Sequence, residues 1–184
     1  ERHTHARRLA CSTALVAVAV FSAPRAAPAQ SLFAAARVQY TTGWQPESIS
    51  LGDLNGDGRL DAITPERNAG LLHVYYGRGD GTFFETNSLP ATQPNVIALA
   101  DYNLDGFLDI AYASNNGHLI VLGGDGLGGF FQVLDQMLTQ TIPSAIAAGD
   151  LNLDGRPDLA IGHSSQIITV VLFYPGFHTS TNTY

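Results

Sequence analysis

Several residue types are missing from this chain or nearly so. It has no lysine, and it has one cysteine, one methionine and one tryptophan among 184 residues. Its nine cationic residues are therefore all arginines, and against sixteen acidic residues they leave a net charge of −7. Because nucleic acid and anionic membrane surfaces repel a chain of this charge, neither is an expected partner.

The sequence also lacks the common catalytic motifs. It contains no G-x-S-x-G turn, no phosphate-cradling glycine loop and no paired carboxylates outside three acidic stretches. Four of its six histidines, His73, His118, His163 and His178, lie among the repeats but not at matching repeat positions, which argues against a role in metal binding or catalysis. We therefore expect no enzyme activity. A lyase or hydrolase built on the same scaffold stays open as the alternative.

Residues 1–29 have the pattern of a secretory signal peptide. Arg2, Arg7 and Arg8 form a basic start, an apolar core follows at 9–21, and small residues at 27–29 precede a cleavage site. The apolar core is shorter than the roughly 20 residues that span a membrane. A buried N-terminal helix is the alternative interpretation, but an arginine and two prolines flank the run. The sequence thus predicts a secreted or cell-surface protein with no membrane span in its mature chain.

The single cysteine, Cys11, lies inside this predicted leader, so the mature chain cannot form a disulfide. An exported domain without disulfides needs another source of stability, and a bound metal ion is one such source.

One nine-residue pattern, D-x-N-x-D-G-x-x-D, occurs three times. The copies begin at residues 53, 101 and 150, which are 48 and 49 residues apart, and each is preceded by the spacing P-x-x-I-x-x-x-D. A period of this length with several matched landmarks indicates repeated supersecondary units that stack on one another. The predicted units span about residues 32–82, 83–129 and 130–184, within a single domain at 30–184.

Each unit is predicted to contain four short strands. In the first unit these are residues 48–51, 60–64, 71–76 and 82–85, which are rich in β-branched and aromatic residues and bounded by Gly, Asn and Asp. No stretch of the mature chain sustains a helical apolar period. The expected fold is all-β, a partial β-propeller of about three four-stranded blades, each with a hairpin loop between its first two strands.

The nine-residue stretches have the chemistry of a metal site. Nine of the sixteen acidic residues lie in them, and such a density of carboxylates is unfavourable unless a cation neutralises it. Oxygen ligands without His or Cys suit Ca²⁺ better than Zn²⁺, and Mg²⁺ requires a stricter octahedral geometry.

Five positions of each nine-residue stretch can supply a ligand: positions 1, 3, 5 and 9 offer side chains, and position 7 offers a main-chain carbonyl. We expect about three Ca²⁺ ions, one per loop. The alternative is an Asx-rich turn without an ion. The predicted ligands are Asp53, Asn55, Asp57, Arg59, Asp61, Asp101, Asn103, Asp105, Phe107, Asp109, Asp150, Asn152, Asp154, Arg156 and Asp158.

These stretches resemble the calcium loops of the FG-GAP/VCBS repeat family, the blades of integrin-α-like β-propellers. The G-R-G-D-G-T-F run at 77–83 is similar to the glycine-aspartate turn of that family. The resemblance implies Ca²⁺ between the first two strands of each blade and an extracellular role in binding or adhesion. Family propellers usually have about seven blades, whereas three cannot close a ring.

From this resemblance we expect a binding, adhesion or structural module whose ligand is an extracellular protein or a carbohydrate. Because three blades leave exposed strand edges, self-association through the open propeller is also expected, as is completion by a partner. The remaining alternative is a truncated fragment of a larger repeat protein.

Overall fold

The structure, a computed structural model, describes residues 38–42, 46–138 and 142–184. The predicted signal peptide at 1–29 lies outside these residues. All of the described residues belong to one compact unit, Val38–Tyr184.

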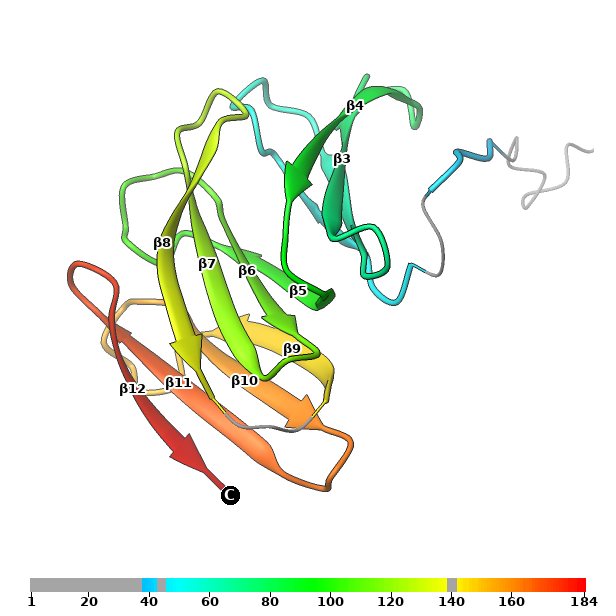
Figure 1. Ribbon diagram of the computed structural model, residues 1–184. Coiled ribbons are helices and arrows are strands. Elements are labelled where there is room, and N and C mark those ends of the chain that lie inside the picture. The colour runs from blue at the N-terminus through cyan, green and yellow to red at the C-terminus, as the bar shows by residue number, and fades with distance from the viewer. Residues whose placement is uncertain (1–37, 43–45, 139–141) are drawn as a thin grey trace, which may run out of the picture. The chain divides into compact units, whose positions relative to one another are not determined.

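The described residues form strands joined by turns and contain no helix (Figure 1). The strands pair into three antiparallel sheets of four, in the orders β1-β2-β3-β4, β5-β6-β7-β8 and β12-β11-β10-β9. Each sheet is a meander, because every strand pairs with its neighbour in sequence. The strands are β1 Ser50–Gly52, β2 Asp61–Glu66, β3 Leu71–Gly77, β4 Phe83–Pro90, β5 Pro94–Ala100, β6 Asp109–Ser114, β7 His118–Gly124, β8 Phe130–Met137, β9 Pro143–Gly149, β10 Asp158–His163, β11 Ile168–Tyr174 and β12 His178–Thr183.

Three four-stranded sheets without closure confirm the predicted fold class, an all-β partial propeller. We call the sheets the first, middle and third blades in chain order. The sequence units and the blades are offset by one strand: β4 and β8 follow the predicted unit boundaries at 82 and 129, yet each pairs back onto the preceding strand. The reason is that a tight glycine turn reverses the chain before each of these strands.

The third blade is complete although its sequence lacks a clear glycine-aspartate turn. Gly176 and Phe177 both adopt positive φ, 76° and 60°, and this turn leads from β11 into β12. The strand β12 reads H-T-S-T-N-T, a polar and partly β-branched sequence. An outermost strand needs backbone pairing on one side only and no apolar face, which is why hydrophobic patterning does not mark it.

Two apolar clusters join the blades. One contains Ile63 and Val74 of the first blade together with Ile110 and Tyr112 of the middle blade. The other contains Ala111 of the middle blade together with side chains of the third blade. Since successive side chains of a strand point to opposite faces, Ile110 and Ala111 serve different clusters.

The middle blade is therefore covered on both faces, and β6 is buried along its whole length. The first and third blades each contribute one face to a cluster. Within the described residues, no helix has the length and apolar character required to cross a membrane.

Candidate metal loops

The three acidic stretches form the turns between β1 and β2, between β5 and β6 and between β9 and β10. In the first loop, the Asp57 amide donates hydrogen bonds to Asp53 Oδ1 and Asn55 Oδ1, both at 3.1 Å. The Gly58 amide donates to Asp53 Oδ2 at 2.8 Å, and the Arg59 amide to Asp57 Oδ1 at 2.9 Å. Side chains at positions 1, 3 and 5 therefore converge on the same turn.

The second and third loops repeat this pattern. The Asp105 amide lies 3.0 Å from Asp101 Oδ1 and 2.8 Å from Asn103 Oδ1. The corresponding distances from the Asp154 amide in the third loop are 3.1 Å and 2.9 Å. Two carboxylates and one amide side chain are thus gathered in each loop.

Position 6 of each loop needs a left-handed backbone, and glycine provides it. Gly58, Gly106 and Gly155 have φ values of 80°, 93° and 86°. Position 4 is also left-handed, with φ of 65° at Leu104 and 63° at Leu153, where a side chain makes this conformation costly. The bonds from the turn amides to the side chains at positions 1 and 3 offset that cost.

Position 9 has a structural role that the sequence did not reveal. Asp61 is fully buried, and its two carboxylate oxygens accept hydrogen bonds from the amides of Leu54, at 2.9 Å, and Gly77, at 2.8 Å. The carboxylate therefore ties the start of the loop to the end of the third strand of its blade.

The same arrangement recurs in the other two blades. Asp109 accepts from the amides of Tyr102 and Gly124, and Asp158 from those of Leu151 and Phe173. The sequence shows an aspartate at position 9 of every loop, but the second amide that it binds lies fifteen or sixteen residues after that aspartate. Only strand pairing brings the two together.

Burial changes the acidity of these carboxyl groups. It raises the pKa of Asp109 to about 6, against the opposing effect of the amides of Gly124 and Tyr102. It also raises the pKa of Asp61, again with two amides acting in the opposite direction. Neighbouring loop carboxylates add to both increases in pKa, because like charges disfavour the ionised form.

Arginines compensate little of this charge. Arg59 Nη1 lies 3.5 Å from Asp57 Oδ2, with half of the Arg59 side chain in solvent. Arg156 Nη1 donates to the carbonyl of Asn103 in the neighbouring loop. The second loop carries Phe107 at the equivalent position and so has no arginine of its own.

The donor set of each loop fits a hard cation. A carboxylate oxygen has more than one lone pair, so an oxygen that accepts an amide proton can still bind a metal ion. The gathered donors are carboxylate and amide oxygens, which Ca²⁺ prefers. Among the described residues, no group of three or more His, Cys, Asp or Glu side chains is arranged as a metal site. The convergent set in each loop instead consists of two carboxylates and an amide.

The glycine-aspartate turn between β3 and β4 contains the tripeptide Arg78-Gly79-Asp80. Asp80 Oδ1 accepts hydrogen bonds from the amide of Thr82, at 2.9 Å, and from its hydroxyl, at 2.6 Å. Arg78 lies 5.8 Å from the centre of the Phe84 ring. Both side chains therefore have a structural function in the turn.

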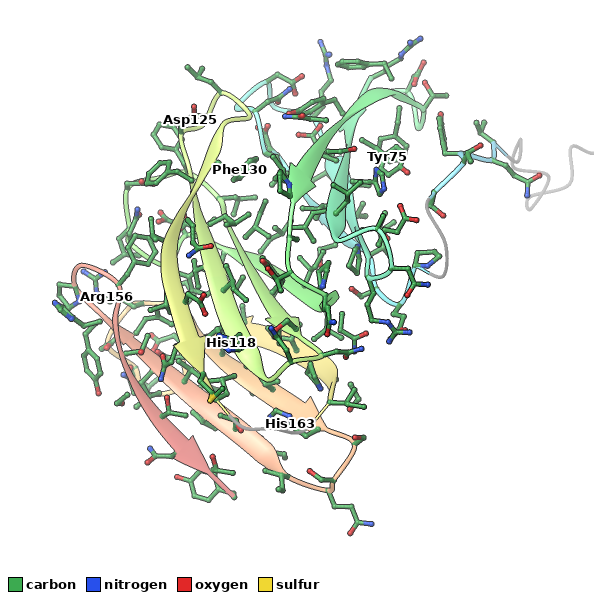
Figure 2. All side chains as sticks on the ribbon, viewed as in Figure 1. Tyr75, His118, Asp125, Phe130, Arg156 and His163 are labelled. Carbon is green, nitrogen blue, oxygen red and sulfur yellow. The ribbon has the colours of Figure 1, made fainter. Side chains whose placement is uncertain are left out.

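The histidines lie apart from the loops. His73 contacts Glu66 at 2.8 Å and Ser88 at 3.1 Å, all three on adjacent strands of the first blade. A cross-strand polar ladder accounts for this chain of contacts. His118 starts β7 of the middle blade and His163 ends β10 of the third blade (Figure 2).

Comparisons with known proteins agree with this architecture. A family model described as FG-GAP-like repeat matches residues 101–161. These residues include the whole of the second and third loops. The comparison with curated proteins found no match.

Among solved structures, the chain is similar to a crystal structure of BBS1N in complex with ARL6DN, soaked with lead. The TM-score is 0.53 at 15% sequence identity, and the match covers 73% of this chain and 42% of that one. At this identity the match supports the fold alone. The family match confirms the resemblance found in the sequence: residues 101–161 of this partial β-propeller are similar to an FG-GAP-like repeat.

Proposed function

We propose that this protein is an exported, calcium-binding FG-GAP repeat module that acts by binding another molecule or by supporting a larger assembly, without catalysis. The observation that carries the calcium proposal is the threefold repetition of one oxygen arrangement. In each loop, positions 1 and 3 share a single amide donor, so their free lone pairs lie on one turn.

An ion in each loop would be held by positions 1, 3, 5 and 9 and by the carbonyl at position 7, the fifteen residues predicted from the sequence. Bound Ca²⁺ supplies positive charge to a turn that otherwise concentrates three carboxylates. The chain itself supplies the rigidity: glycine at position 6 reverses the backbone, and position 9 anchors the loop to the blade. Binding to the folded state alone would then stabilise the protein by mass action.

Calorimetric titration of the purified protein with CaCl₂ tests this proposal. We expect about three ions per chain and a rise in the thermal midpoint that a chelator reverses. At a free ion concentration of a hundred times Kd, the gain per site is about 2.7 kcal/mol. The double variant Asp101→Asn/Asp105→Asn should lower the stoichiometry by one. An unchanged midpoint at millimolar Ca²⁺ would overturn the proposal.

The proposed ligand is an extracellular protein or a carbohydrate. Support comes from the repeat family, which favours a binding module in general, and from the leader-like residues 1–29. Fusion of residues 1–29 to a reporter enzyme tests export. Secretion of the reporter is expected, and its loss when the apolar core at 9–21 is interrupted by charges serves as the control.

A further inference from the structure

The loop end of the middle blade carries apolar side chains at three turn positions. Leu104 and Phe107 occupy positions 4 and 7 of the second loop and are 49% and 45% exposed. Leu127 occupies the tip of the turn between β7 and β8 and is 83% exposed. We call these three side chains the apolar tips. Polar residues and glycine are the usual choice at such exposed turn positions, so the apolar tips require an explanation.

The first blade has polar or small residues at the same three positions. The strand registers of the two blades place Asp80 at the position of Leu127. Gly56 and Arg59 hold positions 4 and 7 of the first loop. Because these residues build the same turns in the same fold, the fold itself does not require apolar side chains there.

Leu104 breaks a local backbone rule without an internal gain. Its φ of 65° lies in the left-handed region, which is costly for a residue with a side chain. The first loop meets the same requirement with Gly56, at φ 71°, without this cost. Half of Leu104 nevertheless remains in solvent, although the third blade lies beside its loop. A residue that breaks a local rule without an evident structural gain indicates a functional position.

The Leu127 side chain takes no part in the hydrogen bonds of its turn. Asp125 Oδ1 accepts from the amides of Leu127 and Gly129, both at 2.8 Å, and Figure 2 shows Asp125 at this turn. Gly126 and Gly128 flank the leucine with φ values of 70° and 87°. The backbone and Asp125 therefore build the turn, and the leucine side chain projects from it.

The turn that carries Leu127 is packed between the first and second loops. The Phe107 ring lies so close to Gly126 that a methyl group on this glycine would not fit. On the other side, a Cβ on Gly56 would lie 2.7 Å from the carbonyl oxygen of Gly126. The apolar tips thus belong to neighbouring turns that support one another, and they form one surface.

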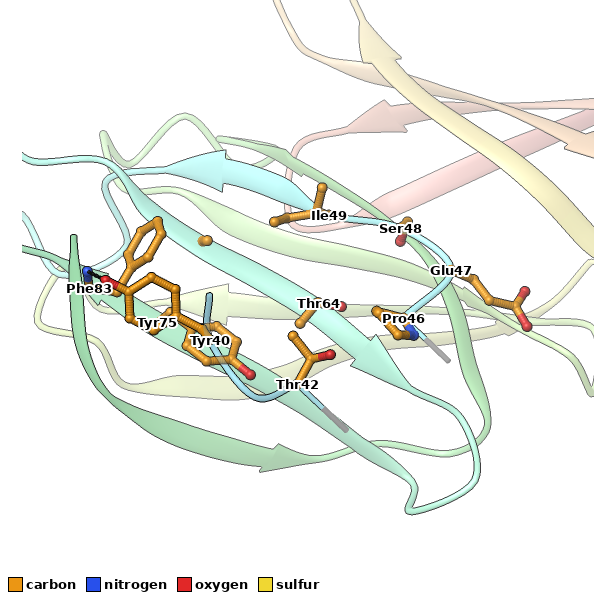
Figure 3. A pocket seen from close by; sticks show the side chains of 10 residues that line it. Tyr40, Thr42, Pro46, Glu47, Ser48, Ile49, Thr64, Tyr75 and Phe83 are labelled. Carbon is orange, nitrogen blue, oxygen red and sulfur yellow. Dashed lines mark hydrogen bonds between the residues drawn. The ribbon is translucent and has the colours of Figure 1, made fainter. Parts of the chain in front are cut away.

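The apolar hollow of the first blade is a different kind of surface. A cavity of about 390 Å³ is lined by Tyr40, Tyr75, Phe83 and neighbouring residues (Figure 3). Tyr40 packs edge-on against Phe83 with ring centres 5.3 Å apart, and Tyr75 is only 7% exposed. These aromatic side chains contact one another beneath residues 38–42, whereas the apolar tips are 45–83% exposed.

The charge around the apolar tips is negative. Asp105 directly follows Leu104, Asp125 precedes Leu127 by two residues, and both carboxylates are exposed. Residues 94–137 contain no arginine, and the chain has no lysine. This surface therefore attracts a cationic group and repels an anionic one.

The shape and size of this surface fit a lipid bilayer better than a protein groove. Specific protein interfaces bury about 800 Å² per partner and involve about 20–30 residues on each side. Three side chains on two turns offer far less, but protruding leucine and phenylalanine side chains can enter the boundary between headgroups and acyl chains without a shaped complement. The choline ammonium of a phosphatidylcholine headgroup also supplies the cation that the neighbouring carboxylates attract.

We propose that the loop end of the middle blade binds the surface of a phosphatidylcholine bilayer and that Leu104, Phe107 and Leu127 insert below the headgroups. The driving force is the removal of their apolar surface from water, so binding does not require calcium. Three side chains give a weak and reversible attachment. This partner lies beyond the protein or carbohydrate ligand of the proposed function.

Flotation of phosphatidylcholine vesicles at millimolar lipid with the purified protein, in calcium and in chelator, tests the proposal. We expect the protein in the vesicle fraction under both conditions. Leu127→Asp and Phe107→Arg introduce the residue types that the first blade has at these positions, so circular dichroism should show both variants folded. Each should lower the partition coefficient at least about fivefold.

Three further variants serve as controls. Leu127→Asn removes the apolar side chain without adding charge and should weaken vesicle binding as Leu127→Asp does. Leu104→Gly should weaken vesicle binding but raise the thermal midpoint, because glycine adopts the left-handed backbone without strain. Met137→Asp changes a side chain that is 59% exposed at the far end of β8, and it should leave vesicle binding unchanged.

Three results would overturn the proposal. These are no vesicle binding in either condition, vesicle binding that Leu127→Asn and Phe107→Arg leave unchanged, and self-association without lipid that the same variants abolish. The last result, seen by sedimentation, would assign the apolar tips to a contact with a second copy. Because the calorimetric calcium titration contains no vesicles, it can fail or succeed separately from vesicle binding.

Discussion

The second and third loops share six of their nine residues and the same main hydrogen bonds, yet their second residues have opposite environments. The amides of Tyr102 and Leu151 both donate to the position-9 carboxylate at 2.9 Å. Tyr102 is fully buried against Phe173, whereas half of Leu151 is exposed. The difference arises because the third blade covers the second loop, whereas no blade among the described residues lies beside the third loop. The turn is a local structure, while the burial of its side chains depends on neighbours.

The largest contrast should appear on truncation of these two side chains. Tyr102→Ala removes a fully buried aromatic ring from the joint, which should lower the free energy of unfolding by about 3–5 kcal/mol. Leu151→Ala should change the free energy of unfolding by about 0.5 kcal/mol or less. Urea unfolding of the two variants measures both changes. Equal losses would contradict the assigned environments.

The next contrast lies within one loop, between a buried and an exposed carboxylate. Asp109→Ala leaves the amides of Tyr102 and Gly124 without their acceptor, at about 1–3 kcal/mol each. Removal of a buried charge offsets part of this cost, so we expect a net loss of about 2–4 kcal/mol. Asp105→Ala, on the exposed side of the same loop, should cost less than about 1 kcal/mol in chelator. The urea midpoints of the two variants, measured without calcium, give both losses of stability. A larger loss with Asp105→Ala would refute the role of Asp109 in anchoring the loop to the blade.

Two equivalent glycines should respond differently to a methyl group. A Cβ on Gly52 would lie 2.5 Å from Leu108 Cδ1 of the middle blade, whereas a Cβ on Gly149 would meet nothing within 4 Å. Gly52→Ala should therefore cost about 1–2 kcal/mol through overpacking. Gly149→Ala should be neutral or stabilise by about 0.5 kcal/mol, because alanine loses less backbone entropy in a strand. Thermal midpoints provide the test, and a marked loss at Gly149 would show that its face is already covered.

The smallest expected effect concerns the hydroxyl of Tyr102. It is buried without a hydrogen-bond partner among the described residues, and burial raises its pKa strongly. Tyr102→Phe removes this unsatisfied group and keeps the ring stack, so the protein should become more stable by up to about 1 kcal/mol. Tyr112→Phe is the matched control: its hydroxyl accepts from the Thr92 amide at 3.3 Å, and its loss should be slightly destabilising. A clear destabilisation by Tyr102→Phe would indicate a partner for that hydroxyl.

Much of the fold could be predicted from local patterns. The spacing of Asp, Asn and Gly located all three loops, and the β-branched runs located the strands on either side, because turns and short strands depend on nearby residues. The strand β12 was harder to place, since its polar sequence has no apolar alternation and its turn uses Phe177 in a left-handed conformation. The oxygen-rich side chains at positions 1, 3 and 5 were predicted as neighbours and do share one turn.

What the sequence determined by itself is the threefold turn, the acidity concentrated in it and the stacking of repeated β units. These depend on backbone preferences and on charges within nine residues. The tertiary structure decided which loops have a buried second residue and which distant amide each position-9 aspartate binds. Those features depend on contacts between residues fifteen or more positions apart, and a repeated motif is the same whether or not another blade lies beside it.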